Sequence, residues 1–249
     1  MARVDVVGRL AAMIASVRLD HPVRVGIDGV DCAGKTVLAD ELVAPLKSFS
    51  RPVIRASLDG FHNPRAIRHG RGRTSPIGYY EDSFDHGAVV SCILRPLGPG
   101  GNMRFKPAVF DFRTDSPIEG PWLTAPKDAV LVFEGIFLHR SELLPYWDFS
   151  VFVDADFEGT IRRAVRRDKD LFETGSKTRE IYEERYIPGQ KLYISTQRPL
   201  EKADVIVGNN DPDNPVLTVN TGHGGTAEVT AGERERSREC NLKAGRYHK

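Results

Sequence analysis

The chain has 249 residues, of which 40% are hydrophobic and 28% charged, a composition typical of folded rather than disordered proteins. Thirty-five lysines and arginines nearly balance 34 aspartates and glutamates, so a net charge of +1 gives no overall attraction to nucleic acid or an anionic membrane. The cysteines, Cys32, Cys92 and Cys240, are too few and scattered for a disulfide framework or a CxxC metal site. This pattern excludes structural zinc and favours a reducing, cytoplasmic location.

Apolar periodicity predicts helices that alternate with buried strands. Residues 3–18 form an amphipathic helix, 23–28 a β-branched strand, and 35–46 a second helix after a glycine-rich turn. Further short apolar runs follow at residues 52–58, 129–133, 149–153 and 203–207. The runs are far shorter than the roughly 20 residues that span a bilayer, and no signal peptide is expected. The alternation predicts an α/β fold with a mostly parallel sheet covered by helices on both faces.

Two stretches depart from this alternation. Residues 98–116 begin with Gly-Pro-Gly-Gly and contain Pro107 among apolar residues, which predicts a small hairpin insertion that projects from the sheet. Residues 212–249 are rich in proline, glycine, threonine and charge, with few side chains able to anchor a core. We expect most of this tail to be disordered.

Residues 29–36 read GVDCAGKT and match the pattern G-x-x-x-x-G-K-[ST]. The motif lies between a predicted strand and a predicted helix, where backbone N–H groups and the helix dipole can hold a triphosphate. Lys35 is expected to reach the β and γ phosphates, and the Thr36 hydroxyl to bind Mg²⁺. The predicted nucleotide contacts are Gly29, Asp31, Cys32, Ala33, Gly34, Lys35 and Thr36. The alternative is a strand-to-helix turn that binds nothing.

Two acidic residues follow predicted strands. Asp59 follows the run that ends at residue 58 and Glu134 follows residue 133, and ligands of open α/β sheets bind beyond the carboxyl ends of strands. Asp59 is expected to accept a proton from an acceptor hydroxyl and to contact the metal through water. Glu134 is expected to orient Mg²⁺ or its waters. The alternative for Asp59 is a turn cap with Gly60, and the alternative for Glu134 is a solvent-exposed acid at a strand end.

Four arginines occur on the predicted helical segment 157–168. Helical spacing places Arg162 with Arg166 in one stripe and Arg163 with Arg167 in another. Such pairs suit a lid that closes over a polyphosphate, because arginine can make bidentate contacts to the transferring group. The alternative is a solvent-exposed helix face.

In combination these motifs resemble the uridine kinase and phosphoribulokinase family of P-loop kinases over roughly residues 20–211. The similar segments are Asp59-Gly60-Phe61-His62, Phe110-Asp111-Phe112, Phe133-Glu134-Gly135-Ile136, Phe152-Val153-Asp154, Arg163 with Arg167-Asp168, and Ala203-Asp204-Val205-Ile206. The resemblance implies a three-layer P-loop NTPase fold, similar to nucleoside monophosphate kinases, with the kinase domain at 1–211 and a lid at about 160–180. It also implies ATP, Mg²⁺ and transfer of the γ-phosphoryl group to a small-molecule hydroxyl.

The resemblance assigns catalysis to Lys35, Asp59, Arg163 and Arg167. A nucleoside such as uridine or cytidine is the first expectation for the acceptor. The predicted acceptor contacts are His62, Arg65, Tyr80, Phe110 and Phe112, and Tyr79 and Phe84 either shape the same pocket or pack in the core.

Departures from uridine kinases leave other acceptors open. Phe110 stands in place of a tyrosine, Asp115 in place of a substrate-contacting histidine and Arg185 in place of a glutamine, and an Arg-Gly-Arg-Asp lid stretch is missing after residue 168. Four arginines within residues 65–73 favour an anionic acceptor such as a phosphosugar or pantothenate as the alternative. A second alternative is that the protein binds nucleotide without catalysing a reaction. No nucleic-acid or membrane partner is expected, and the sequence leaves room for a homo-oligomer.

Overall fold

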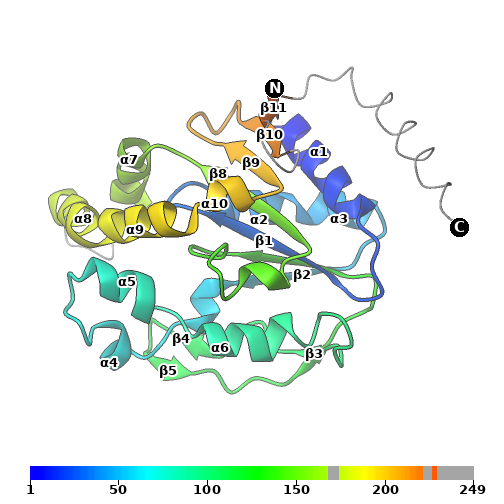
Figure 1. The fold of residues 1–249 in the computed structure, drawn as a ribbon, viewed down its shortest axis with the longest axis horizontal. Coiled ribbons are helices and arrows are strands. Elements are labelled where there is room, and N and C mark those ends of the chain that lie inside the picture. The colour runs from blue at the N-terminus through cyan, green and yellow to red at the C-terminus, as the bar shows by residue number, and fades with distance from the viewer. Residues whose placement is uncertain (168–173, 221–225, 229–249) are drawn as a thin grey trace, which may run out of the picture.

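A central sheet forms the middle of the molecule, which the computed structural model describes over residues 1–167, 174–220 and 226–228. Within these residues the strand order is β11-β10-β9-β8-β1-β7-β2 (Figure 1). Strands β9, β8, β1, β7 and β2 run parallel, and β10 and β11 continue the sheet in antiparallel fashion. The strands are β1 (Val23–Gly29), β2 (Val53–Ser57), β7 (Val130–Glu134), β8 (Phe149–Asp154), β9 (Val205–Gly208), β10 (Val216–Asn220) and β11 (Thr226–Glu228).

Alternate residues of the central strands supply two separate cores. Val130 and Val132 of β7 belong to the core on one face, whereas Leu131 and Phe133 belong to the core on the other. This period of two is the geometry of a β-strand, and a strand that is apolar on both sides must be covered on both sides. The apolar runs of the sequence are therefore central strands.

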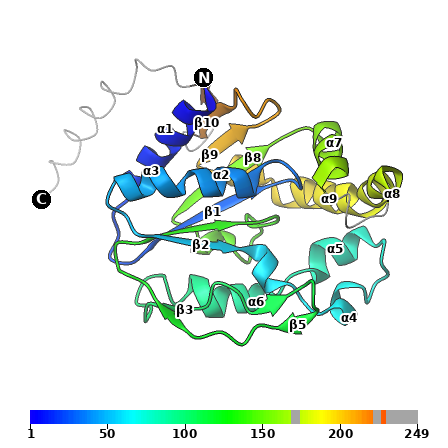
Figure 2. The same cartoon turned by 180° about the vertical axis from the view of Figure 1, so that it is seen from behind.

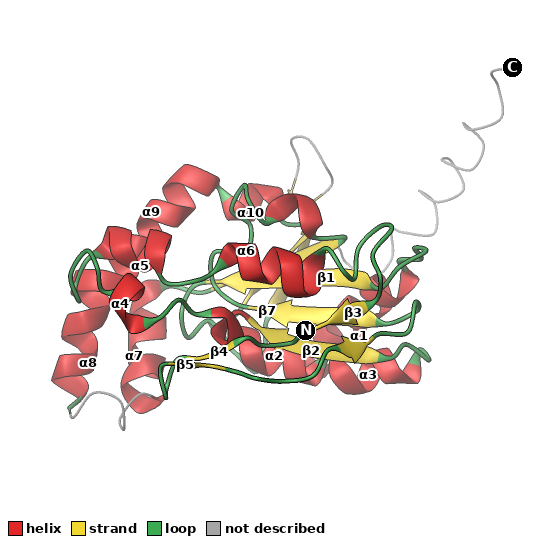
Figure 3. Ribbon diagram, turned by 90° about the horizontal axis from the view of Figure 1, so that it is seen from below, coloured by secondary structure: helices red, strands yellow, loops and turns green. Residues whose placement is uncertain are grey.

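Helices cover both faces of the sheet, which confirms the predicted three-layer α/β fold. One layer contains α1 (Arg3–Ser16), α2 (Lys35–Glu41) and α3 (Val43–Ser48) (Figure 2). The other contains α6 (His86–Val89), η2 (Val90–Leu94), η3 (Leu144–Tyr146), α9 (Ile187–Gln197) and α10 (Pro199–Lys202) (Figure 3). At one end of the sheet lie η1 (Leu58–Phe61), α4 (Arg65–Arg68), α5 (Pro76–Asp82), α7 (Phe157–Arg167), α8 (Gly175–Ile181) and η4 (Tyr182–Tyr186).

The insertion extends further along the chain than residues 98–116. Strand β3 (Arg104–Phe105) pairs with β6 (Leu123–Thr124), and β4 (Phe110–Asp111) pairs with β5 (Ser116–Pro117), both antiparallel. Strand β6, which pairs with β3, lies beyond the predicted boundary at residue 116. Phe105 of β3 and Ala125, next to β6, are both buried in the same core as η2. Strands of two residues are too short to show apolar periodicity, so the sequence pattern underestimated the length of this insertion.

The predicted disordered tail contributes strands to the sheet. Val216–Asn220 forms β10 against β9, with Leu217 buried in the core and the Asn220 amide donating to the carbonyls of Leu200 and Ala203. These contacts stabilise a strand whose own sequence is only weakly apolar. The rest of the tail expectation falls on residues 221–225 and 229–249, outside the described residues, as do residues 168–173 of the expected lid. In the part of the chain that is described, no helix has the length and apolar character needed to cross a bilayer.

Candidate active site

The loop between β1 and α2 adopts a tight conformation with several positive φ angles. Gly29, Cys32 and Gly34 have φ of 148°, 56° and 102°. A Cβ at Gly29 would lie 2.3 Å from the Val153 carbonyl oxygen, and one at Gly34 would lie 2.5 Å from Nδ2 of Asn209. Both glycines are therefore required by backbone conformation and by close neighbours. Positive φ angles in a turn before a helix can direct N–H groups inward, the geometry in which they converge on an anion.

Lys35 brings a positive charge into this loop. It is the first residue of α2, is 7% exposed, and its Nζ donates to the Val30 carbonyl at 2.8 Å. The Cys32 sulfur lies 3.6 Å from the hydroxyl of Tyr182, the arrangement expected of a small side chain that fills space between the loop and η4. The loop thus presents a fixed cation beside converging backbone, as phosphate binding needs.

A cavity of about 610 Å³ opens over the loop, within the roughly 300–1,000 Å³ typical of ligand sites. Of the predicted nucleotide contacts, it is lined by Asp31, Cys32, Gly34, Lys35 and Thr36. Gly29 and Ala33 lie outside this lining and shape the backbone beneath it.

The predicted acids Asp59 and Glu134 line the same cavity. Glu134 ends β7 and is 6% exposed, and in the sheet it pairs with Ser57, the last residue of β2. Asp59 follows two residues later in η1, whose first turn is capped by Ser57, because the Asp59 N–H donates to Oγ of Ser57. Adjacent parallel strands therefore deliver both carboxylates to one edge of the sheet.

The surroundings of Asp59 raise the pKa of its carboxyl group above the ordinary aspartate value. The main cause is partial desolvation by the surrounding residues, although Asp59 itself is exposed and lines the cavity, and the Asp31 carboxylate adds to the effect. Lys35, Arg167 and Arg113 act in the opposite direction. Asp59 is thus a carboxylate with increased proton affinity, held within electrostatic reach of Lys35.

The donor set suits Mg²⁺. The Thr36 hydroxyl and the carboxylates of Asp59 and Glu134 supply hard oxygen donors around one cavity. Within the described residues, no cluster of three or more metal-ligating side chains forms a dedicated cage. Mg²⁺ usually keeps several waters and binds through one or two carboxylates and the substrate phosphates, so these three residues would hold it together with a nucleotide.

Only one of the two arginine stripes of α7 faces the cavity. Arg163 and Arg167 line it, whereas Arg162 is 56% exposed and lies 3.7 Å from Glu158 on the outer surface, and Arg166 is exposed as well. Arg163 donates to the carbonyls of Cys32 and Ala33 at 3.3 and 3.4 Å, which attaches α7 to the phosphate loop.

Aromatic side chains line the part of the cavity beyond Asp59. The His62 ring lies 4.5 Å from that of Phe84 and 4.7 Å from that of Phe112. Burial lowers the pKa of His62 to about 4, so this ring is neutral at physiological pH, with its Nδ1–H donating to the Asp59 carbonyl. Tyr79 and Tyr186, with ring centroids 4.7 Å apart, complete this wall.

Three predicted acceptor contacts lie outside the cavity lining. Arg65 is exposed at the start of α4, and Phe110 is buried at the base of β4. Tyr80 packs in the core against Phe137, and its hydroxyl accepts a hydrogen bond from Gln197. The cavity instead receives the neighbouring Tyr79, from the helix α5 that Ser75 caps and Pro76 begins. The Tyr79 ring packs against that of Tyr186.

The sequence did not reveal the hydrogen bonds that fix Asp31. The hydroxyl of Tyr79 donates to the Asp31 carboxylate, and Gln190 of α9 both accepts from the Asp31 N–H at 2.7 Å and donates to its carboxylate. These partners lie far apart in the chain, so only the α/β topology could have placed them together. They connect the phosphate loop with the aromatic wall.

A nucleotide-binding loop after the first parallel strand, with acids at the ends of the neighbouring strands and arginines on a facing helix, defines the class of P-loop kinases. Residues 25–214 match the Phosphoribulokinase / Uridine kinase family, and the chain belongs to this family. The family resemblance of the motifs is confirmed, and with it an ATP-dependent kinase of this type.

Individual relatives agree with this placement. Uridine-cytidine kinase B from Dictyostelium discoideum is 28% identical over 191 residues, which cover 75% of this chain and 74% of that protein. A uridine kinase from Chlamydia pneumoniae is 29% identical over 205 residues, covering 78% and 85%. The solved structure of a possible uridine kinase from Bacillus stearothermophilus shares the fold, with a TM-score of 0.63, 23% identity, and coverage of 82% of this chain and 96% of that one.

Proposed function

We propose that this protein transfers the γ-phosphoryl group of ATP to a hydroxyl group of a nucleoside, with uridine and cytidine as the first candidates. The observation that carries this proposal is the aromatic wall formed by His62, Tyr79, Phe112 and Tyr186 beyond Asp59. A flat, neutral base can stack on such side chains.

The distribution of charge within the cavity also favours a neutral acceptor. Its cationic lining residues, Arg3, Lys35, Arg163 and Arg167, come from the phosphate loop, α7 and the start of α1. Among the aromatic residues the only titratable nitrogen is that of His62, whose pKa of about 4 keeps it uncharged at physiological pH. Arg113 lies over the Phe112 ring, and Arg185 lies over the rings of Tyr79 and Tyr186, at 5.6–5.8 Å, but neither arginine lines the cavity. An anionic group beside the aromatic residues would therefore lose water without a direct contact to a cationic lining residue, which is costly.

The arginines of residues 65–73 support the same conclusion, since none of them lines the cavity. Arg68 pairs with Asp115 at 3.1 Å, and Arg71 pairs with Asp82 at 2.9 Å. Arg185, 5% exposed, donates to the carbonyls of Arg68 and Arg73 and so holds this segment from inside. Arg68 and Arg71 thus have acidic partners outside the cavity, which weakens the case for a phosphosugar or pantothenate.

The chemistry follows from the positions of the carboxylates. The acceptor hydroxyl oxygen forms a bond to the γ-phosphorus, the bond to the β–γ bridging oxygen breaks, ADP leaves, and the hydroxyl proton passes to Asp59. The raised pKa of Asp59 suits this proton transfer. Lys35 holds the β and γ phosphates, and Arg163 and Arg167 face the transferring group. Mg²⁺, when held by Thr36 and Glu134, supplies charge neutralisation of the phosphates.

We also place this activity in the cytoplasm. ATP is the phosphoryl donor, and within the described residues Cys32 and Cys92 form no disulfide, as is usual in a reducing compartment.

The test is an ADP-release assay across uridine, cytidine, purine nucleosides, pantothenate, glycerate and pentose phosphates, with Lys35→Ala as the blank. We expect pyrimidine nucleosides to increase ADP release well above the slow hydrolysis seen without acceptor. Phe112→Ala should raise the nucleoside KM and leave the Kd for ATP unchanged, because Phe112 lies on the aromatic wall. Stimulation by an anionic acceptor alone would replace the nucleoside assignment. An absence of stimulation across the panel would favour a non-catalytic nucleotide-binding protein.

A further inference from the structure

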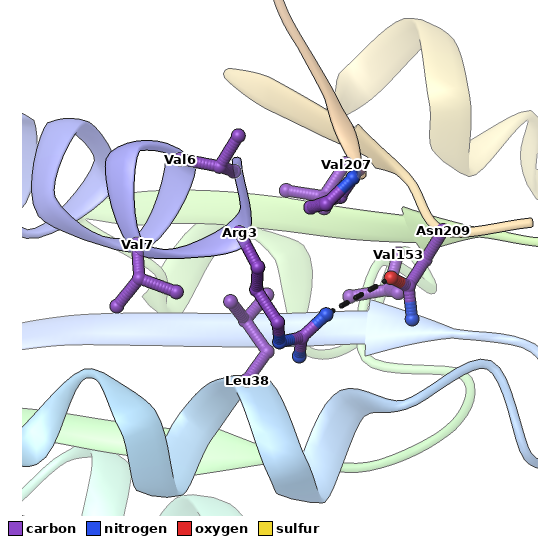
Figure 4. A pocket seen from close by; sticks show the side chains of 8 residues that line it. Arg3, Val6, Val7, Leu38, Val153, Val207 and Asn209 are labelled. Atoms are coloured by element: carbon purple, nitrogen blue, oxygen red, sulfur yellow. Dashed lines mark hydrogen bonds between the residues drawn. The ribbon is translucent and has the colours of Figure 1, made fainter. Parts of the chain in front are cut away.

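The N-terminal helix α1 contributes Arg3 to the end of the cavity that lies away from the acceptor wall. The family match begins at residue 25, so α1 (Arg3–Ser16) precedes the segment that defines the family. Arg3 nevertheless lines the large cavity, together with Asn209, Pro212 and Asp213. Arg3 also lines a second, small pocket, and Figure 4 shows its side chain there, extending from α1 to Asn209 beside Leu38, Val153 and Val207.

The guanidinium of Arg3 joins three parts of the chain. Its Nε donates to both carboxylate oxygens of Glu41 on α2, at 2.8 and 2.9 Å. One terminal nitrogen donates to Oδ1 of Asn209 at 3.2 Å and to the Pro212 carbonyl at 2.9 Å. The backbone N–H of Arg3 donates to the Asp213 carbonyl at 3.1 Å. Arg3 therefore holds the turn after β9 against α2.

Asn209 carries this connection into the phosphate loop. It is 3% exposed, and its Nδ2 donates to the Ala33 carbonyl at 2.6 Å. Its own carbonyl accepts a hydrogen bond from Arg163 at 2.7 Å. The same amide lies where a Cβ of Gly34 would be, so Asn209 and the loop are closely fitted. Arg3 and Arg163 thus hold Asn209 from opposite sides.

The direction of the nucleotide follows from the ends of the cavity. The phosphates must lie at Lys35, with the γ-phosphoryl toward Asp59, so the ribose and base extend away from Asp59. The remaining lining at that end consists of Arg3, Val37, Asn209, Pro212 and Asp213. Most donors of Arg3 already have protein partners, so its contribution is to fix this lining rather than to bind the base directly.

We propose that Arg3 is a positioning residue for nucleotide binding: by holding the 209–213 turn against α2, α1 fixes the subsite for the base of ATP. This inference rests on the nucleotide site of the proposed function and is independent of the acceptor. Its consequence is that loss of Arg3 weakens ATP binding through the base and ribose while the phosphate loop stays intact, because Asn209 keeps its bonds to Ala33 and to the Asp154 carbonyl.

The test compares the full-length protein with Arg3→Met, which keeps an unbranched stem and removes the guanidinium donors. Without any acceptor, Mg²⁺-ATP and Mg²⁺-tripolyphosphate are titrated into each protein. We expect the Kd for ATP to rise about tenfold in Arg3→Met, the size of effect when one or two net hydrogen bonds are lost. The Kd for tripolyphosphate, which has no base or ribose, should stay at the wild-type value.

Arg18→Ala is the matched control, since Arg18 is exposed just beyond α1 and lines neither cavity. It should bind both ligands as the wild type does. If Arg3→Met does not fold, Arg3→Lys serves instead, because a single ammonium group can pair with Glu41 but cannot bridge Asn209 and Pro212 as well. An unchanged Kd for ATP, or an equal loss for ATP and tripolyphosphate, would overturn the proposal. A wrong acceptor assignment would leave these titrations unaffected.

Discussion

Asp31 and Asp59 face one cavity from the phosphate loop and from η1, and the charge of Asp31 contributes to the raised pKa of Asp59. Like charges that share a site disfavour ionisation of one another. The carboxylate that we propose as the proton acceptor therefore has its proton affinity set partly by the loop that holds the phosphates.

The pH dependence of turnover follows from this pair. Because Asp59 must be ionised to accept a proton, the acid limb of kcat/KM should lie above 3.8, the ordinary aspartate pKa. Asp31→Asn removes a charge that raises this pKa, so the limb should move to lower pH. Asp20→Asn, at an exposed site outside the cavity, should leave it in place. A limb that stays fixed or moves upward in Asp31→Asn would contradict the coupling.

Replacing the carboxylate itself should separate catalysis from binding. We expect Asp59→Asn to lower kcat by about 10²-fold or more, because the acceptor proton then has no base, while the Kd for ATP stays nearly unchanged. Single-turnover kinetics and nucleotide titration measure the two quantities. A variant that retains wild-type kcat would remove Asp59 from the proposed mechanism.

The same substitution should stabilise the fold. A carboxyl group whose pKa is raised by folding binds its proton more tightly in the folded state, so the free energy of unfolding falls as pH rises from the unfolded pKa through the folded one. An asparagine at this position does not ionise, so its contribution to the free energy of unfolding does not fall with pH. Asp59→Asn should thus have a higher Tm than the wild type at pH 7, and the difference should vanish below the unfolded pKa, as thermal unfolding at several pH values would show.

The phosphate loop assignment depends on Lys35. Lys35→Ala removes the buried ammonium next to Val30, and we expect the Kd for ATP to rise at least ~100-fold, with turnover lost as well. Circular dichroism provides the control for folding. Wild-type ATP affinity in this variant would mean that the triphosphate binds elsewhere.

The two arginine stripes of α7 provide a matched pair of substitutions. Arg163→Ala removes contacts to Cys32, Ala33 and Asn209, so both ATP affinity and turnover should fall by about tenfold or more. Arg162→Ala removes an exposed side chain beside Glu158 and should change neither. Equal effects of the two substitutions would show that α7 acts through its net charge rather than through these contacts.

Sequence patterns predicted the parts of the site that lie on short contiguous segments. The G-x-x-x-x-G-K-T motif predicted the loop, and Asp59 and Glu134 followed from their positions after buried strands. The choice between Tyr79 and Tyr80 could not be made in this way, because it depends on the register of the short helix α5, which its Ser75 cap and its packing determine.

Contacts between segments far apart in the chain could not be predicted from sequence patterns, because these patterns describe only local structure. Strand β10 is only weakly apolar, and it is stabilised by Leu217 and by bonds from Asn220 to the residues before β9. Likewise, the sequence shows Arg3 only as a polar residue at the start of an amphipathic helix. Its hydrogen bonds to Asn209 and Pro212 depend on the fold, which brings the turn at 209–213 beside it. Such pairings follow from topology and not from local periodicity.

The contact between Arg3 and the 209–213 turn has a consequence during synthesis. The contact joins residues near the two ends of the kinase domain, because the Arg3 N–H donates to the Asp213 carbonyl. Arg3 leaves the ribosome early and Asp213 late. A nascent chain that ends before this turn carries the complete phosphate loop but lacks Asn209, to which both Arg3 and Arg163 donate. Under the role that we propose for Arg3, full affinity for ATP would require that the turn after β9 has been translated.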